Sequence, residues 1–305
     1  ATKLVVLNKD EDTVSFVGTS DGRTIKQIET PYNPHEVLVV PHENKTYVSC
    51  SLGNEVVVID NDDLEIVNII THPKFDFPHG LAATPDGEKV YLAATYAECI
   101  YVLDPATDEI TNVIDSRQKW THMVSFSPDG EIAYIANMNS DNVSLIDTET
   151  EEFIDHVPVG GGPEGIAAHP NGEHLYVANQ EDSSLYVMDV NTFDVLYERE
   201  IGDLPVRCVF SPDGRYALIA NRASGDLSIV DSQFELTNEL DPHTIRSPNE
   251  LFLHDSENEL DTEVRPWEIT RISLGQAPGG IVFEENGSYA YVANNFTNDV
   301  SVVNM

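Results

Sequence analysis

Three histidines stand at equivalent places in a repeated pattern, each directly before a run of apolar residues. His35, His79 and His122 are separated by 44 and 43 residues, and Glu164 occupies the same place 42 residues further on. Three imidazoles and a carboxylate are a suitable ligand set for a divalent transition metal such as Zn, Cu, Mn or Fe, with positions left for water or substrate. These four residues are therefore a candidate metal site, provided that the fold brings them together.

The repeat itself indicates which fold would do so. Val206 and Gly279 continue the series after intervals of 42 and 73 residues. Each period contains four short β-type segments, and a period near 42 residues filled in this way is typical of a β-propeller blade. The longer interval is one period plus an insertion at about 232–265, which is acidic and contains prolines, so we expect a surface loop there. We therefore predict a single β-propeller domain over 1–305.

The number of blades depends on how the N-terminal segment is interpreted. Six inner strands are visible at the six aligned positions, whereas residues 4–28 read as three short strands separated by acidic and glycine-containing turns. These three would be the second, third and fourth strands of a further blade that lacks an inner strand. We predict an all-β propeller of four-stranded antiparallel blades, with seven blades preferred and six blades plus spare N-terminal strands as the alternative.

A propeller would place the histidine column at one mouth of its central channel, because the inner strands surround that channel. A metal site is one interpretation. A second is a metal-free polar or substrate-contacting cluster, since repeats related by duplication inherit residues, and a third is incidental recurrence. Aromatic and basic neighbours in the adjoining loops suit an organic ligand. The candidate ligand-binding residues are Tyr32, Phe75, Phe77, Trp120, Tyr96, Met138, Arg207 and Arg222.

Basic residues are rare in this chain, with 16 Lys and Arg against 53 Asp and Glu and a formal net charge of -37. Arg207 and Arg222 could anchor an anionic substrate, but each could also pair with an acidic side chain, and we favour the ion pair. The overall charge repels nucleic acid and anionic membranes, so neither is an expected partner. Such a balance is typical of a protein dissolved in concentrated salt, which predicts a halophilic source, with a very acidic mesophilic protein as the alternative.

Tetrapeptides within the repeats carry a family resemblance. Tyr134–Asn137, Tyr176–Asn179 and Tyr291–Asn294 read YIAN, YVAN and YVAN, each preceded by a Pro-Asp-Gly-like turn and followed by a V-S-L-I-D-like strand. These segments resemble the YVTN family of β-propeller repeats over nearly the whole chain. The resemblance implies the propeller fold. It leaves the function open, since the family includes surface-layer proteins, non-catalytic dehydrogenase subunits and proteins similar to lactonases.

Several kinds of chemistry lack a signature in the sequence. There is no nucleophile motif, phosphate-cradling glycine loop or dinucleotide fingerprint, so we expect no nucleotide cofactor. No apolar run is long enough to span a bilayer, so we expect no membrane insertion. We expect a location outside the cytoplasm or at the cell surface, with the cytoplasm of a salt-accumulating organism as the alternative.

Three functions are compatible with these features. The first is a binding or scaffold propeller that holds a small-molecule ligand or a partner protein. The second is a metal-dependent enzyme, a hydrolase, lyase or oxidase, in which the axial metal acts as a Lewis acid or activates water. The third is a non-catalytic propeller subunit of a redox complex. Whether the protein is an enzyme is left open by the sequence.

Overall fold

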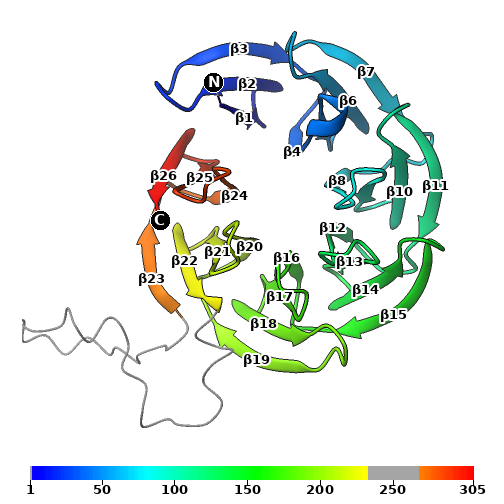
Figure 1. Cartoon of the computed structure of the whole chain (residues 1–305), viewed down its shortest axis with the longest axis vertical. Helices are drawn as coiled ribbons and strands as arrows, with labels where there is room; N and C mark the ends of the chain where they lie inside the picture. The colour runs from blue at the N-terminus through cyan, green and yellow to red at the C-terminus, as the bar shows by residue number, and fades with distance from the viewer. Residues whose placement is uncertain (1, 233–267) are drawn as a thin grey trace, which may run out of the picture.

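The computed structural model describes residues 2–232 and 268–305, and these form a ring of seven antiparallel β-sheets around a central axis (Figure 1). The all-β propeller is confirmed, as is the count of seven blades, and the six-bladed alternative is wrong. The predicted insertion at about 232–265 lies, apart from its first residue, outside the described residues. No helix in the described ranges is long and apolar enough to cross a membrane.

The chain fills the blades in order. Blade 1 contains β1 (Lys3–Asn8), β2 (Thr13–Gly18) and β3 (Thr24–Glu29), and blade 2 contains β4 (Pro34–Val40), β5 (Lys45–Cys50), β6 (Glu55–Asp60) and β7 (Ile66–Thr71), with the 3-10 turn η1 (Pro41–Glu43) after β4. Blade 3 contains β8 (Pro78–Ala83), β9 (Val90–Ala94), β10 (Cys99–Asp104) and β11 (Glu109–Asp115). Blade 4 contains β12 (Thr121–Phe126), β13 (Ile132–Asn137), β14 (Asn142–Asp147) and β15 (Glu152–Pro158).

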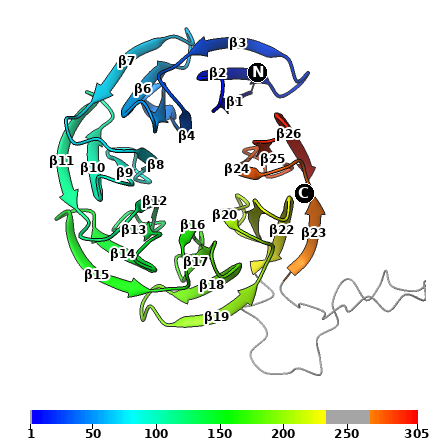
Figure 2. The same ribbon diagram turned by 180° about the vertical axis from the view of Figure 1, so that it is seen from behind.

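The second half of the ring continues the pattern. Blade 5 contains β16 (Pro163–Ala168), β17 (His174–Asn179), β18 (Ser184–Asp189) and β19 (Val195–Glu200). Blade 6 contains β20 (Pro205–Phe210), β21 (Tyr216–Asn221), β22 (Asp226–Asp231) and β23 (Glu268–Ser273), and blade 7 contains β24 (Pro278–Phe283), β25 (Tyr289–Asn294) and β26 (Asp299–Asn304). In the four-stranded blades the first strand lines the axis and the fourth lies on the outer rim, as the view from behind also shows (Figure 2).

The asparagine that ends each YVAN-like strand holds the second and third strands of its blade together. Asn137 is fully buried, and its amide Nδ2 donates to Asn142 Oδ1 and Ser144 Oγ, both at 2.8 Å. Asn221 and Asn294 make the same two bonds to residues five and seven positions later. The repeated motif therefore exists because a buried amide needs partners at that spacing.

The turn between the first and second strands of a blade has an equally local cause. Thr84 Oγ1 donates to Asp86 Oδ1 at 2.6 Å and accepts from the Lys89 amide at 3.0 Å. Gly87 takes a φ of 76°, which a residue with a Cβ adopts only with strain. Ser127 and Ser211 begin the same arrangement in blades 4 and 6.

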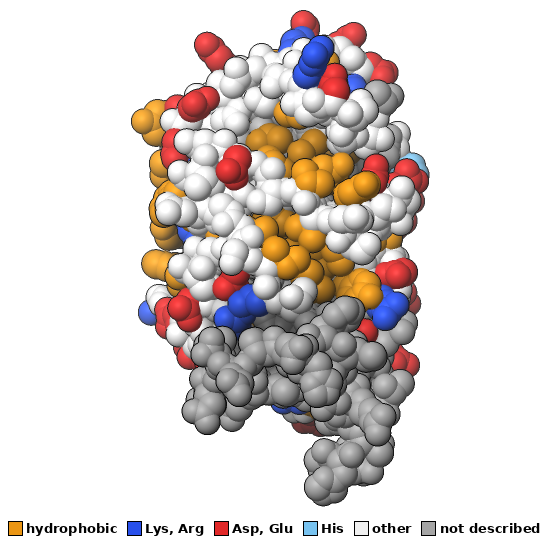
Figure 3. All heavy atoms as spheres, turned by 90° about the vertical axis from the view of Figure 1, so that its left-hand side faces the viewer, with side chains coloured by type: hydrophobic (Ala, Val, Ile, Leu, Met, Phe, Trp, Pro, Cys, Tyr) orange, Lys and Arg blue, Asp and Glu red, His pale blue; other side chains and the backbone are white. Residues whose placement is uncertain are grey.

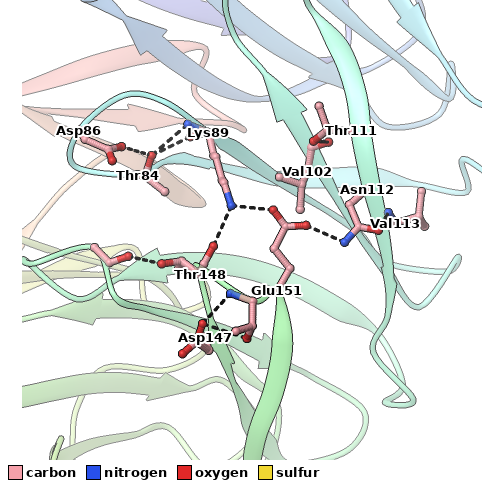
Figure 4. A network of polar contacts seen from close by, with 12 residues as sticks. Thr84, Asp86, Lys89, Val102, Thr111, Asn112, Val113, Asp147, Thr148 and Glu151 are labelled. Carbon is pink, nitrogen blue, oxygen red and sulfur yellow. Dashed lines mark hydrogen bonds and ion pairs between the residues drawn. The ribbon is translucent and has the colours of Figure 1, made fainter.

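Lysines at the start of the second strand tie each of the first three blades to the next one. Lys89 Nζ donates to the Thr148 carbonyl at 2.8 Å and to Glu151 Oε1 at 2.7 Å, and Asn112 Nδ2 donates to the other oxygen of that carboxylate (Figure 4). Lys45 occupies the equivalent position in blade 2 and reaches the 105–108 turn of blade 3. Lys3 occupies it in blade 1 and reaches the Asn61 carbonyl of blade 2. The equivalence of Lys3 and Lys45 identifies β1 as a second strand, as predicted.

The junction between blade 7 and blade 1 differs from the other six. The described strands leave the inner position of blade 1 and the outer position of blade 7 unfilled. Val302 of β26 is 60% exposed, whereas Leu145 and Val187, at the same place in blades 4 and 5, are 0% and 1% exposed. Figure 3 shows hydrophobic side chains gathered on the side of the ring where these two blades meet. One face of blade 7 is therefore incompletely covered.

We expect Asn137→Ala to lower the free energy of unfolding by about 1–3 kcal/mol, because it removes the buried amide and leaves its partners without a donor. Urea denaturation followed by circular dichroism measures the change. Asn139→Ala, at an exposed position two residues later, is the matched control and should change stability by less than about 0.5 kcal/mol. Equal effects of the two substitutions would contradict the role assigned to the motif.

We also expect amide hydrogens of β24–β26 to exchange with solvent before those of β12–β14. The last blade has one weakly covered face, and local opening is easiest where buried apolar contacts are fewest. Hydrogen–deuterium exchange with mass spectrometry compares the two blades within a single sample. Equal protection of the two blades would show that the junction is as stable as the others.

Candidate functional site

The structure brings the predicted histidine column together at one mouth of the channel. His35, His79 and His122 are each the second residue of an inner strand, on β4, β8 and β12. The rings of His35 and His79 have centroids 4.5 Å apart, and those of His79 and His122 stack at 3.7 Å. Glu164, at the same place on β16, has Oε1 3.9 Å from His122 Nε2. The four side chains thus form an arc over four consecutive blades.

A β-bulge explains why these residues point into the mouth. The pairing of each inner strand with its neighbour shifts register at its start, for example between Pro34 and Glu36 and between Thr121 and Met123. His35 and His122 are the residues left out of the ladder. Bulges redirect side chains, and here the same bulge occurs at the first residues of all six inner strands. The aligned position is therefore a structurally special one in every blade.

An ion pair crosses the axis at this level. The Arg207 guanidinium on β20 of blade 6 is paired with Glu36 Oε1 on β4 of blade 2, and it also contacts Met123 Sδ at 3.5 Å. The carboxylate of Glu36 lies 3.9 Å from His79 Nε2. The expectation that Arg207 has an acidic partner is confirmed. Glu36 itself was not among the predicted site residues, although it directly follows an aligned histidine.

A lysine from blade 1 completes the ring of charged groups. Lys9, in the β1–β2 loop, places Nζ 2.9 Å from His35 Nε2. Because an ammonium group only donates, Nε2 of His35 must be the unprotonated nitrogen, and Nδ1 then donates to Asn33 Oδ1 at 3.2 Å. Lys9 is another functional candidate that the sequence analysis missed. It belongs to the blade that lacks an inner strand, so it falls outside the alignment.

Burial controls the protonation of this cluster. Desolvation lowers the pKa of His35 to about 2 and that of His122 to about 3, and it lowers the pKa of His79 well below its usual value, with nearby cations adding to each effect. Burial raises the pKa of Glu164 to about 7, against the opposing effect of Arg207 and Arg222. Burial also lowers the pKa of Lys9. At neutral pH the three imidazoles are therefore neutral and good acceptors.

The predicted ligand-binding residues fall into two groups. Phe77, Tyr96 and Trp120 lie at the mouth, with Phe77 stacked on His79 at 5.9 Å, Phe77 4.9 Å from Tyr96, and Tyr96 5.8 Å from Trp120. Tyr32 is 64% exposed in the loop before β4. Phe75 and Met138 are instead buried, and Phe75 packs edge-on against Tyr101 in the core between blades.

Arg222, which follows β21, belongs with the mouth. Its guanidinium lies over the Phe296 ring at 5.9 Å from the centroid, and its charge acts on His35, Lys9 and Glu164. Within residues 2–232 and 268–305, neither Arg222 nor Lys9 has a carboxylate within ion-pair distance. Arg207 therefore has the predicted acidic partner, whereas Arg222 has none among the described residues.

The present arrangement does not form a metal coordination sphere. The Nε2 atoms of His79 and His122 face different carboxylates, Glu36 and Glu164, and Nε2 of His35 is bonded to Lys9. Stacked rings direct their lone pairs along roughly parallel planes, not toward one shared point. In the described part of the chain, no group of three or more His, Cys, Asp or Glu residues is placed to hold a metal ion.

Comparison with known proteins identifies the fold but no family. No family model and no curated protein matches the chain. Among solved structures, it is similar to hydrazine synthase of Kuenenia stuttgartiensis, with a TM-score of 0.82 and 20% identity over 99% of this chain and 92% of that one. It is also similar to a functionally unknown protein of Desulfotomaculum acetoxidans DSM 771, with a TM-score of 0.76 and 16% identity over 100% and 93% of the two chains. These likenesses show the propeller fold alone, and the resemblance to YVTN repeats stays a prediction.

The opposite pKa shifts predict opposite pH dependences for two substitutions. The folded protein keeps a proton on Glu164 between pH 4.5 and 7 that the unfolded chain releases, so this residue lowers stability as pH rises through that range. As the pH rises from 4.5 to 8, the free energy of unfolding of Glu164→Gln should increase relative to that of wild type by up to about 3 kcal/mol. Urea denaturation across that range measures the difference, with Glu149→Gln at an exposed site as the control.

His122→Gln should behave in the reverse sense. Below pH 6.5 the unfolded chain binds a proton that folded His122 does not accept until about pH 3, so wild type loses stability as pH falls. As the pH falls, the free energy of unfolding of the variant should decrease less than that of wild type, by up to about 1.4 kcal/mol per pH unit. The same slope in both proteins would show that this imidazole is not held neutral.

Proposed function

We propose that this protein is a binding propeller whose channel mouth holds a small organic anion, most simply a carboxylate. The observation that carries the proposal is the gathering of Lys9, Arg207 and Arg222 around neutral imidazoles. The chain has only 16 basic residues against 53 acidic ones, so three cations at one mouth are a strong local departure from the average. A location outside the cytoplasm or at the cell surface belongs to the same proposal.

The balance of charge at the mouth favours an anion over a cation. Arg207 is neutralised by Glu36, but Lys9 and Arg222 have no acidic partner among the described residues. A half-buried ammonium without a counter-ion is unfavourable, and burial accordingly lowers the pKa of Lys9. A bound carboxylate would supply the missing charge and would accept hydrogen bonds from the ammonium and guanidinium groups.

A metal ion is the second candidate, and one observation favours it. His79 Nδ1 is buried without a hydrogen-bond partner in the described structure, and neutral imidazoles are the form that binds Zn, Cu, Mn or Fe. Binding would require His79 and His122 to unstack so that their nitrogens converge with Glu164. The resulting enzyme, a hydrolase, lyase or oxidase, would use the metal as a Lewis acid. Elemental analysis of untagged protein and of His79→Ala tests this candidate, which fails if neither contains stoichiometric metal.

The third possibility, a non-catalytic subunit of a redox complex, rests on the similarity to hydrazine synthase. At 20% identity that similarity supports the shared fold and adds nothing about partners. We therefore rank it below the other two.

Isothermal titration with four sodium salts tests the proposal directly. Acetate, succinate, benzoate and cyclohexanecarboxylate are titrated at one ionic strength, because salt screens such contacts. We expect at least one to bind with a Kd of about 1 mM or lower, and we expect Arg222→Gln and Lys9→Met each to weaken that binding roughly tenfold. Arg23→Gln is the matched control, because the side chain of Arg23 is 86% exposed in the turn between β2 and β3. Absence of binding by all four, or binding that both variants leave unchanged, would overturn the proposal.

A further inference from the structure

The residue before each inner strand has a left-handed backbone conformation, and in two blades an aromatic residue fills that position. The six residues share φ values between 53° and 64°, and they are Asn33, Phe77, Trp120, Gly162, Leu204 and Ala277. Glycine and asparagine adopt this conformation readily, whereas bulky side chains do so only with strain. Gly162 and Asn33 show that this fold accepts the unstrained choice. Phe77 and Trp120 are therefore kept at the expense of backbone strain.

The strain is held in place by the surrounding backbone. The Phe77 amide donates to Asn54 Oδ1 at 2.9 Å, and its carbonyl accepts from the Thr95 amide at 2.8 Å. The Trp120 carbonyl accepts from the Met138 amide at 3.0 Å. These bonds hold the backbone at both positions. Leu204 and Ala277 have the same conformation in blades 6 and 7, so the strain belongs to the start of the inner strands in general, and the feature particular to blades 3 and 4 is the aromatic ring placed there.

The rings of Phe77, Tyr96 and Trp120 form a partly exposed aromatic surface directly next to the buried imidazoles. Tyr96 is 50% exposed and Trp120 is 42% exposed, and they touch each other and, through Tyr96, Phe77. Phe77 in turn lies parallel to His79, with 8° between the ring planes. The aromatic surface is therefore continuous from solvent down to the level of the cationic groups.

We infer that Phe77, Tyr96 and Trp120 are a stacking platform that selects carboxylates with a planar aromatic body. This inference rests on the proposed function, since it assigns the body of the same ligand. The carboxylate lies toward Lys9 and Arg222, and the ring of the ligand packs against the exposed rings of Tyr96 and Trp120, stacking on one of them and meeting the other edge-on because their planes are 67° apart. Aromatic pairs are favoured beyond the area that they bury, which corresponds to a preference of roughly 3- to 10-fold over a saturated ring of equal size.

Benzoate and cyclohexanecarboxylate test the inference, because they share charge and size and differ in the planarity and aromaticity of the ring. The chain has two tryptophans, so Trp267→Phe leaves Trp120 as the only one. In that variant we expect benzoate to quench the fluorescence of Trp120 and to bind about 3- to 10-fold more tightly than cyclohexanecarboxylate in calorimetry. Tyr96→Leu should remove this preference while leaving cyclohexanecarboxylate binding within about twofold, and Tyr289→Leu, 41% exposed on β25, is the control.

Trp120→Gly provides a second, independent readout. Glycine relieves the backbone strain, so we expect an unchanged or higher Tm together with loss of the preference for benzoate. A lower Tm would show that the ring is structural and would overturn the platform. Equal binding of the two acids by wild type would overturn the platform while leaving the anion site intact, whereas absence of binding by both acids, acetate and succinate would defeat the proposed function itself.

Discussion

The structure depends on one constraint: every blade has two apolar faces, and each must be covered by a neighbour. Six junctions satisfy it with fully buried side chains such as Leu145 and Val187. Lysine contacts such as that of Lys89 with Glu151 reinforce the first three of these junctions at the periphery. Between blades 7 and 1 the described strands cover the faces incompletely, and Val302 stays exposed. The Arg207–Glu36 ion pair is therefore structurally important. It joins blade 6 to blade 2 across the axis, and these two blades flank the weaker junction.

The same repetition that builds the ring builds the site. A bulge at the start of each inner strand directs one residue per blade toward the mouth, so a single recurring position becomes a circle of side chains. Successive blades fill it with different chemistry: imidazole in three, a carboxyl group in the fourth and the aliphatic Val206 in blade 6. Function on this fold is thus decided by which side chains occupy equivalent positions, and not by the fold.

The charged groups at the mouth are mainly basic, whereas the rest of the molecule is strongly acidic. Burial removes the charge from His35, His79 and His122, and Lys9, Arg207 and Arg222 supply positive charge within a strongly acidic chain. Glu164, whose pKa burial raises to about 7, adds little negative charge below neutral pH. Below neutral pH the described groups of this cluster therefore carry more positive than negative charge, and its imidazole nitrogens do not converge on one point.

The sequence by itself determined the blade and the position of the histidine column, and it favoured seven blades over six. Each follows from contacts within about 45 residues, such as the Asn137 amide bonded to Ser144 or the Asp86 turn, and short-range contacts leave a periodic trace in the chain. Only the tertiary structure showed that Glu36 meets Arg207, 171 residues away, that Lys9 bonds to His35, and that Phe75 is a core residue. The physical reason is that these contacts join different blades, whereas the repeat determines only how the strands pair within a blade.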